Sequence, residues 1–181
     1  MLSRVDFSKL TLMDALDLAC LIELEAHKRY LLFAAQLGQR SPGDAGSVFR
    51  SMAESEMKHG EQLAQRRYAL FAEAPRKIKM DDLFDVEAPD VGTAHRNMSP
   101  LKAFRVALAA EQKAYAFYDQ ALAGIEDPDV NALFQELKAE EAEHVRMVEE
   151  IIAKLPPEAA IDIEDVESRH TDPDASLRRR F

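Results

Sequence analysis

Apolar residues recur every three to four positions in four long segments of the sequence, which is the spacing of one face of an α-helix. Thr11 and Asp14 form a T-x-x-D capping pattern before the first segment, and Gly38 and Pro156 are stop signals. The other three segments each begin with a cap residue followed by proline: Ser41-Pro42, Ser99-Pro100 and Asp127-Pro128. The pattern predicts helices over 12–38, 42–73, 100–126 and 128–155.

The lengths of the connections predict how these helices are arranged. Short loops join the first helix to the second and the third to the fourth, so each pair is expected to form an antiparallel hairpin. The segment 74–98 is long enough to run back along a helix of about 40 Å. We therefore predict an all-α four-helix bundle over 1–155, made of two antiparallel hairpins joined by one long crossover over 74–98. Residues 156–181 form a C-terminal tail that is expected to be partly ordered.

The two predicted hairpins repeat the same residues at the same spacing. In the first helix of each hairpin these residues are Glu23, Ala26 and Tyr30, and Glu111, Ala114 and Tyr118. In the second helix they are Phe49, Glu56 and His59, and Phe134, Glu141 and His144. Two hairpins with this repeat would place matching residues around a pseudo-twofold axis.

A helical wheel places one glutamate in the middle of each apolar face. These glutamates are Glu23, Glu56, Glu111 and Glu141, and His59 and His144 lie beside the second and the fourth. On the helix over 42–73 the apolar face consists of Phe49, Met52, Leu63 and Leu70. Most neighbouring glutamates, including Glu25, Glu54, Glu61 and Glu143, face outward, and Glu140 is lateral.

Four buried glutamates need compensating charge. An unpaired buried ion costs several kcal/mol, and four carboxylates together repel one another. No lysine or arginine lies at their level, since Arg67 is three turns from Glu56. Two divalent cations would balance the four charges, and His59 and His144 would add nitrogen ligands. A lone Glu-x-x-His is usually a solvated pair, but two matched copies facing two inward glutamates are typical of a dinuclear metal site.

Tyr30 and Tyr118 follow the glutamates of their helices by two turns. A buried tyrosine hydroxyl needs a hydrogen-bond partner, so we predict that they orient the ligating carboxylates; plain packing is the alternative. His27 lies one turn after Glu23. A hydrogen-bonded core histidine is the preferred interpretation, and an outer partner or a substitute ligand is the alternative.

The stretches ELEAHKRYLLFA, FRSMAESEMKHGEQL, ALAAEQKAYAFYDQAL and LFQELKAEEAEHVRMVEEI resemble rubrerythrin-like proteins of the ferritin-like superfamily, over roughly residues 10 to 155. The resemblance implies a ferritin-like bundle and a di-iron centre held by Glu23, Glu56, His59, Glu111, Glu141 and His144, with Glu56 and Glu141 bridging. Two features depart from the family. Cys20 is the only cysteine, so a rubredoxin module is absent, and Ala114 stands where rubrerythrins carry a further glutamate.

The resemblance implies a di-iron carboxylate oxidoreductase that reduces hydrogen peroxide with electrons from an external donor. A ferroxidase or iron-handling protein that uses dioxygen is the first alternative. The second is a non-catalytic scaffold stabilised by a metal such as zinc. Iron is the expected metal, with manganese or zinc as alternatives, because carboxylates suit iron and manganese while affinity favours zinc.

Composition narrows the choice of partners. The net charge of −10 argues against a nucleic-acid partner. No apolar run is long enough to span a bilayer, and Asp14 and Asp17 interrupt the N-terminal segment where a signal core would lie. A single cysteine suits a reducing compartment. We therefore expect a cytoplasmic protein with no membrane partner, which forms a homodimer or a larger homo-oligomer.

Overall fold

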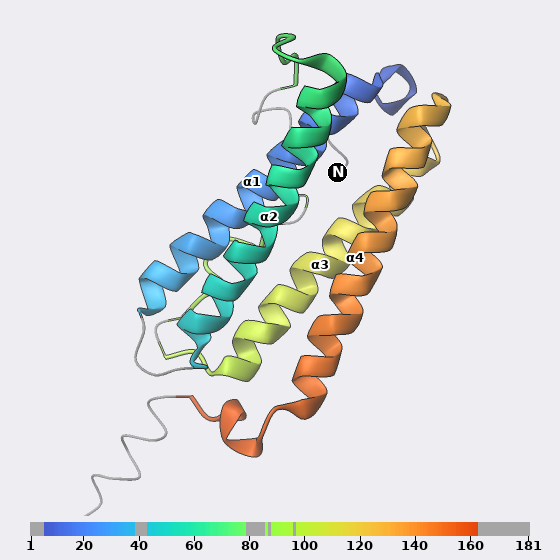
Figure 1. Cartoon of the computed structure of the whole chain (residues 1–181). Coiled ribbons are helices and arrows are strands. Elements are labelled where there is room, and N and C mark those ends of the chain that lie inside the picture. The colour runs from blue at the N-terminus through green and yellow to red at the C-terminus, as the bar shows by residue number, and fades with distance from the viewer. Residues whose placement is uncertain (1–5, 39–42, 79–85, 87, 96, 163–181) are drawn as a thin grey trace, which may run out of the picture.

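The computed structural model describes residues 6–38, 43–78, 86, 88–95 and 97–162. Four long helices make up most of the described chain (Figure 1), and the described residues contain no strand. The helices are α1 (Leu12–Leu37), α2 (Ala45–Phe71), α3 (Pro100–Leu122) and α4 (Pro128–Lys154). Two short 3₁₀ helices, η1 (Phe7–Lys9) and η3 (Pro157–Ala160), flank them. The prediction of an all-α four-helix fold is confirmed.

Three of the four predicted N-caps hold their helices as expected. The Thr11 side chain accepts a hydrogen bond from the Asp14 backbone at the start of α1. Ser99 and Asp127 cap α3 and α4 in the same way, each directly before the proline that begins the helix. These side chains satisfy backbone N–H groups that have no partner within the helix.

Two helix ends differ from their predicted positions, by three and by four residues. The second helix begins at Ala45 instead of 42, because Asp44 is its cap and accepts a hydrogen bond of 2.8 Å from Ser47 N. The predicted cap at residues 41–42 lies outside the described residues. The third helix ends at Leu122 instead of 126. Each of the next three backbone N–H groups bonds to the carbonyl three residues earlier, which tightens the chain into a turn before α4.

The helices pair as two hairpins, α1 with α2 and α3 with α4, and the two helices of each pair lie side by side in Figure 1. Contacts between the hairpins run from α2 to α3 and from α1 to α4. Two clusters of buried apolar residues fill the interior. Along α1, α2 and α3 the two clusters are separated by the level of the inward glutamate, so a polar layer crosses the apolar core.

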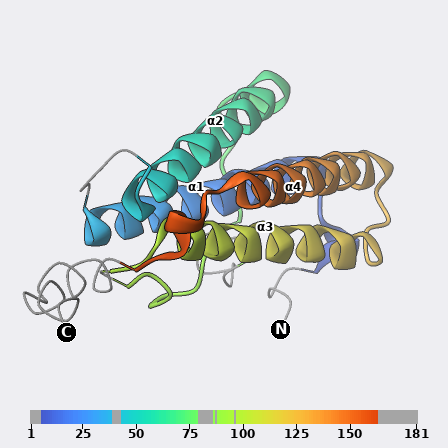
Figure 2. The same ribbon diagram turned by 90° about the horizontal axis from the view of Figure 1, so that it is seen from below.

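One predicted core residue is on the surface. Leu70, in the last turn of α2, is 54% exposed, and its neighbour Tyr68 is 59% exposed. Figure 2 shows α2 inclined away from the layer of the other helices. The side of its C-terminal turns that carries Tyr68 and Leu70 is therefore left uncovered by the other described helices, and the helical periodicity alone does not report this.

The crossover and the beginning of the tail pack on the bundle. Val86 and Ala88 are buried, and Lys113 on α3 donates to the Ala88 carbonyl at 2.6 Å. At the far end of the described chain, Asp162 accepts a hydrogen bond of 3.0 Å from Ser99 N at the start of α3. These contacts hold both segments against α3 and leave the polar layer inside the bundle.

Candidate metal centre

The four predicted inward glutamates are buried in one layer between the two apolar clusters. Glu23, Glu56, Glu111 and Glu141 are between 0% and 3% exposed. Each comes from a different helix, because each helix carries its glutamate at the centre of its apolar stripe. The folding of the apolar faces onto one another therefore brings four carboxylates together.

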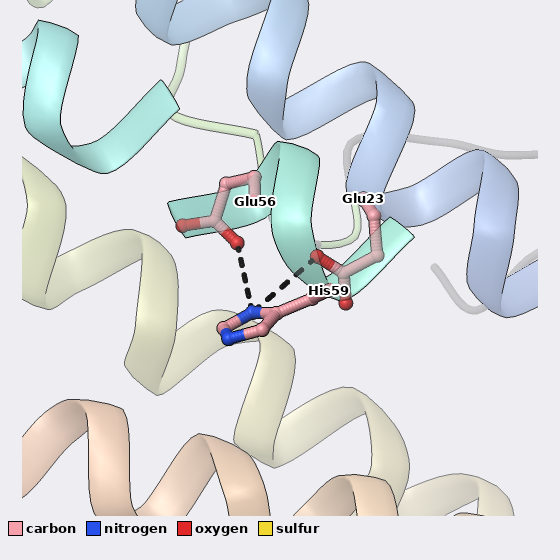
Figure 3. Close-up of side chains that lie close together, drawn as sticks. All are labelled: Glu23, Glu56 and His59. Atoms are coloured by element: carbon pink, nitrogen blue, oxygen red, sulfur yellow. Dashed lines mark ion pairs between the residues drawn. The ribbon is translucent and has the colours of Figure 1, made fainter. Parts of the chain in front are cut away.

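The first hairpin contributes one group of three possible ligands, shown in Figure 3. Glu23 extends from α1 and Glu56 from α2, and both carboxylates point toward His59, one turn further along α2. His59 Nδ1 lies 4.0 Å from Glu23 Oε2 and 3.8 Å from Glu56 Oε2. One nitrogen and two oxygens thus converge on a space that a metal ion could occupy.

The second hairpin contributes a matching group. His144 Nδ1 lies 3.2 Å from Glu111 Oε2 and 3.5 Å from Glu141 Oε2. In each group the three ligand atoms lie within 4.8 Å of one another. The sequence repeat is therefore matched by two groups with the same composition.

The two groups adjoin each other through their histidines. The rings of His59 and His144 stack with their centroids 4.6 Å apart and their planes 8° from parallel. In both residues the nitrogen near the carboxylates is Nδ1. The histidine side chains are also the more exposed ligands, at 25% and 14%.

Electrostatics in the layer is dominated by burial of like charges. Burial raises the pKa of the Glu23 carboxyl well above its ordinary value, and the nearby Glu56 and Glu141 raise it further. Burial also raises the pKa of Glu111 to about 8, although the His144 imidazole opposes the rise. Burial lowers the pKa of His144, but its close contacts with the Glu111 and Glu141 carboxylates outweigh this and raise the pKa to about 11. Without a metal ion, the layer therefore retains protons at neutral pH.

The donor set fits a pair of divalent cations. Glu23 Oε2, Glu111 Oε1 and Glu141 Oε2 are buried and accept no hydrogen bond from the described residues. Two nearby arginines are engaged elsewhere: Arg67 Nε donates to Asp17 at 2.9 Å, its remaining nitrogens bond to backbone carbonyls, and Arg76 Nε lies 3.3 Å from the same Asp17 carboxylate. Four carboxylates and two imidazoles are hard and intermediate ligands that suit iron or manganese.

The predicted outer residues lie where the sequence pattern placed them. Tyr30 and Tyr118 are fully buried and pack against Phe49 and Phe134, respectively. His27 lies in hydrogen-bond contact with the Ala53 carbonyl of α2, with its Nδ1 2.7 Å from that oxygen. A carbonyl oxygen only accepts, so Nδ1 carries the proton of this bond. This contact supports the interpretation of His27 as a hydrogen-bonded core residue.

The model of the rubrerythrin family matches residues 14–152 of the sequence, a range that includes all six candidate ligands. The chain belongs to the rubrerythrin family. No curated protein matches it. The crystal structure of an uncharacterised conserved protein from Magnetospirillum magnetotacticum MS-1 is similar, with 34% identity, a TM-score of 0.61, and coverage of 81% of this chain and 97% of that chain.

Two more distant structures show the same fold. A bacterioferritin from Rhodobacter capsulatus, described with a metal-free dinuclear site and haem iron, has 23% identity and a TM-score of 0.51 over 78% of this chain and 82% of that chain. A dodecameric thioferritin from Bacteroides fragilis has 18% identity and a TM-score of 0.52, with 89% of each chain covered. The prediction of a ferritin-like bundle is confirmed.

Sequence reasoning missed one buried charged pair near the layer. Asp17 is fully buried on α1, where it accepts from Arg67 and lies 3.3 Å from Arg76 Nε. An aspartate inside the apolar stripe and an arginine on the inner face of α2 were the available signals.

Each helix in the described ranges is too polar or too short to cross a lipid bilayer.

Proposed function

We propose that this rubrerythrin-family protein is a di-iron oxidoreductase that reduces hydrogen peroxide with electrons from an external donor. The observation that carries the proposal is the pair of Glu-Glu-His groups joined by stacked histidines inside an apolar core. The residues that would hold the metal ions are Glu23, Glu56, His59, Glu111, Glu141 and His144. The family resemblance gives Glu56 and Glu141 the bridging positions.

A pair of ferrous ions supplies two electrons, which is the number that converts one hydrogen peroxide and two protons into two water molecules. The four carboxylates would neutralise the charge of two divalent ions. Binding would displace the proton that His144 holds toward Glu111 and Glu141, since a metal-bound imidazole nitrogen is unprotonated. The apolar clusters above and below the layer exclude bulk water and limit side reactions.

Tyr30 and Tyr118 have a supporting role in this proposal. Their hydroxyl groups are buried two turns from Glu23 and Glu111 along the same helices. Through hydrogen bonds they would fix the orientation of ligating carboxylates, which tunes a bound metal.

Electrons must come from outside the chain in this proposal. Cys20, the only cysteine, is buried and cannot form a cysteine-ligated electron relay by itself. A separate donor protein or a small reductant is therefore required. A reducing compartment such as the cytoplasm suits this chemistry. A homo-oligomer is part of the same proposal, since the Bacteroides fragilis thioferritin, which has the same fold, is dodecameric.

A ferroxidase is the second candidate, and one observation favours it. Ala114, which is fully buried, occupies the position one turn after Glu111 where rubrerythrins carry another carboxylate. Without that carboxylate the site offers one ligand fewer for peroxide chemistry and is closer to a site that only oxidises iron.

Stopped-flow oxidation of the anaerobic, diferrous protein distinguishes these functions. We expect one equivalent of hydrogen peroxide to oxidise the protein faster than dioxygen does, and the reaction to stop at the diferric state until a reductant is added. Faster oxidation by dioxygen, with iron accumulating beyond two ions per chain, would support the ferroxidase instead. Bound metal that stabilises the fold but reacts with neither oxidant would indicate a structural scaffold.

A further inference from the structure

A groove of about 380 Å³ lies between α1 and α2 and leads from the surface to the first half of the metal centre. Its inner end is formed by Glu23 and Glu56, which are almost completely buried. Leu24, Met57 and Ala64 contribute to its apolar wall, and Glu61 and Arg76 add charged groups to its lining. The groove therefore brings an apolar surface into contact with the candidate ligands.

Gly60 keeps this groove open above Glu23. It faces α1 from the middle of α2, and a Cβ atom at this position would lie 3.3 Å from the Cβ of Glu23. A larger side chain there would fill the space between the helices. Leu24 and Met57, at 39% and 44% exposure, flank the opening, so a molecule in the groove would contact them before it reached the carboxylates.

A second opening reaches the centre from the opposite side. It lies between α2 and α4 beside His59, has a volume of about 80 Å³, and carries the polar side chains of Gln62, Arg66, Glu136 and Glu140. Hydrogen peroxide is close in size to a water molecule, which takes up about 30 Å³ in the liquid. The small polar opening is sufficient for hydrogen peroxide, whereas the groove is nearly five times larger and mainly apolar.

We propose that the groove between α1 and α2 binds the hydrocarbon part of an organic hydroperoxide and directs its O–O group toward Glu23 and Glu56. This inference rests on the proposed function and extends its substrate class. Burial of a hydrocarbon group against Leu24, Met57 and Ala64 provides binding free energy that hydrogen peroxide cannot obtain. Reduction of ROOH breaks the O–O bond with two electrons and two protons to give ROH and water; the two electrons are those that a pair of ferrous ions gives up.

Binding is tested on the full chain loaded with zinc, which is redox-inert. The probe is 2-phenyl-2-propanol, the alcohol formed from cumene hydroperoxide, followed by the ¹³C-methyl signals of Leu24 and Met57. We expect saturable shifts of both signals. Ala64→Leu, which narrows the groove, should weaken binding at least fivefold. Ala69→Leu adds the same side chain at an exposed position of α2 outside the groove and should leave binding unchanged.

The iron-loaded protein supplies the second readout. The ratio of its oxidation rates with cumene hydroperoxide and with hydrogen peroxide should fall at least fivefold in Ala64→Leu and stay constant in Ala69→Leu. Met57→Glu replaces this test if Ala64→Leu does not fold. The change places a charge on the apolar wall at a half-exposed site and should lower the same rate ratio.

Two results would overturn the inference alone: methyl signals that do not respond to the alcohol, or an unchanged rate ratio in a folded groove variant while hydrogen peroxide still oxidises the protein. Loss of reaction with both hydroperoxides in the parent protein would instead refute the proposed function.

Discussion

Replacing Glu111 by glutamine should have opposite effects on the metal-free and the metal-loaded protein. Glu111 is fully buried and its pKa is raised to about 8. At pH 7 the folded protein therefore holds a proton that the unfolded chain, with a carboxyl pKa near 4.5, has released. Two and a half pH units at 1.36 kcal/mol each give a folding cost of about 3 kcal/mol.

Glutamine removes this cost because it is neutral in both states. The change also weakens the 3.2 Å contact with His144 Nδ1, which offsets about 1 to 2 kcal/mol of the gain. We therefore expect the free energy of unfolding of metal-free Glu111→Gln to exceed that of the parent by about 1 to 2 kcal/mol. With metal, the parent should become the more stable of the two proteins, because a neutral amide is a poor metal ligand. A metal ion whose free concentration is 100 times its Kd stabilises the folded protein by about 2.7 kcal/mol.

Urea denaturation at pH 7, in chelator and then with two equivalents of zinc, measures both effects. Glu54→Gln is the matched control, because Glu54 is exposed on α2 and the same change there should alter neither curve by more than about 0.5 kcal/mol. The reasoning fails if metal-free Glu111→Gln is less stable than the parent, or if zinc stabilises the variant as much as it stabilises the parent.

Three further predictions follow from the described contacts. The first concerns pH: Glu111 and His144 both have folded pKa values above their unfolded values, so the stability they contribute is complete below the unfolded pKa and is lost as pH rises through the folded pKa. In urea titrations the metal-free protein should therefore be more stable at pH 6 than at pH 8. Equal unfolding midpoints at the two pH values would contradict a buried layer that holds protons. His27→Ala should cost about 1 to 2 kcal/mol in the same assay and leave the metal content at two ions per chain, whereas loss of an ion would make His27 a ligand. Asp17→Ala leaves Arg67 buried without its partner and should cost about 3 to 5 kcal/mol; a cost below 1 kcal/mol would show that the pair is not buried in solution.

The polar layer could be predicted from the sequence because it depends on local periodicity. Each glutamate lies at the centre of a helical apolar stripe, and the caps Thr11, Ser99 and Asp127 fix where three helices begin. Once the register of each helix is known, the hairpin connections bring the four carboxylates to one level.

Features that depend on contacts between distant segments could not be predicted in this way. The cap of α2 is Asp44 and not the predicted Ser41 before Pro42, and both residues satisfy the sequence rules for the start of a helix. The inclination of α2, which exposes Leu70, and the hydrogen bond between His27 and the Ala53 carbonyl both depend on how α1 and α2 pack. Sequence periodicity shows which side of a helix is apolar but not how far a neighbouring helix covers it.

Metal content per chain tests the central claim most directly. The full chain should be loaded with ferrous iron under anaerobic conditions, desalted, and analysed for iron and protein together with Glu56→Ala, Glu141→Ala and the exposed control Glu54→Ala. We predict two ions per chain in the parent and the control, and the loss of at least one ion in each of the other variants. Two ions in both Glu56→Ala and Glu141→Ala, or no iron in the parent, would contradict the assignment of the buried layer as a dinuclear metal centre.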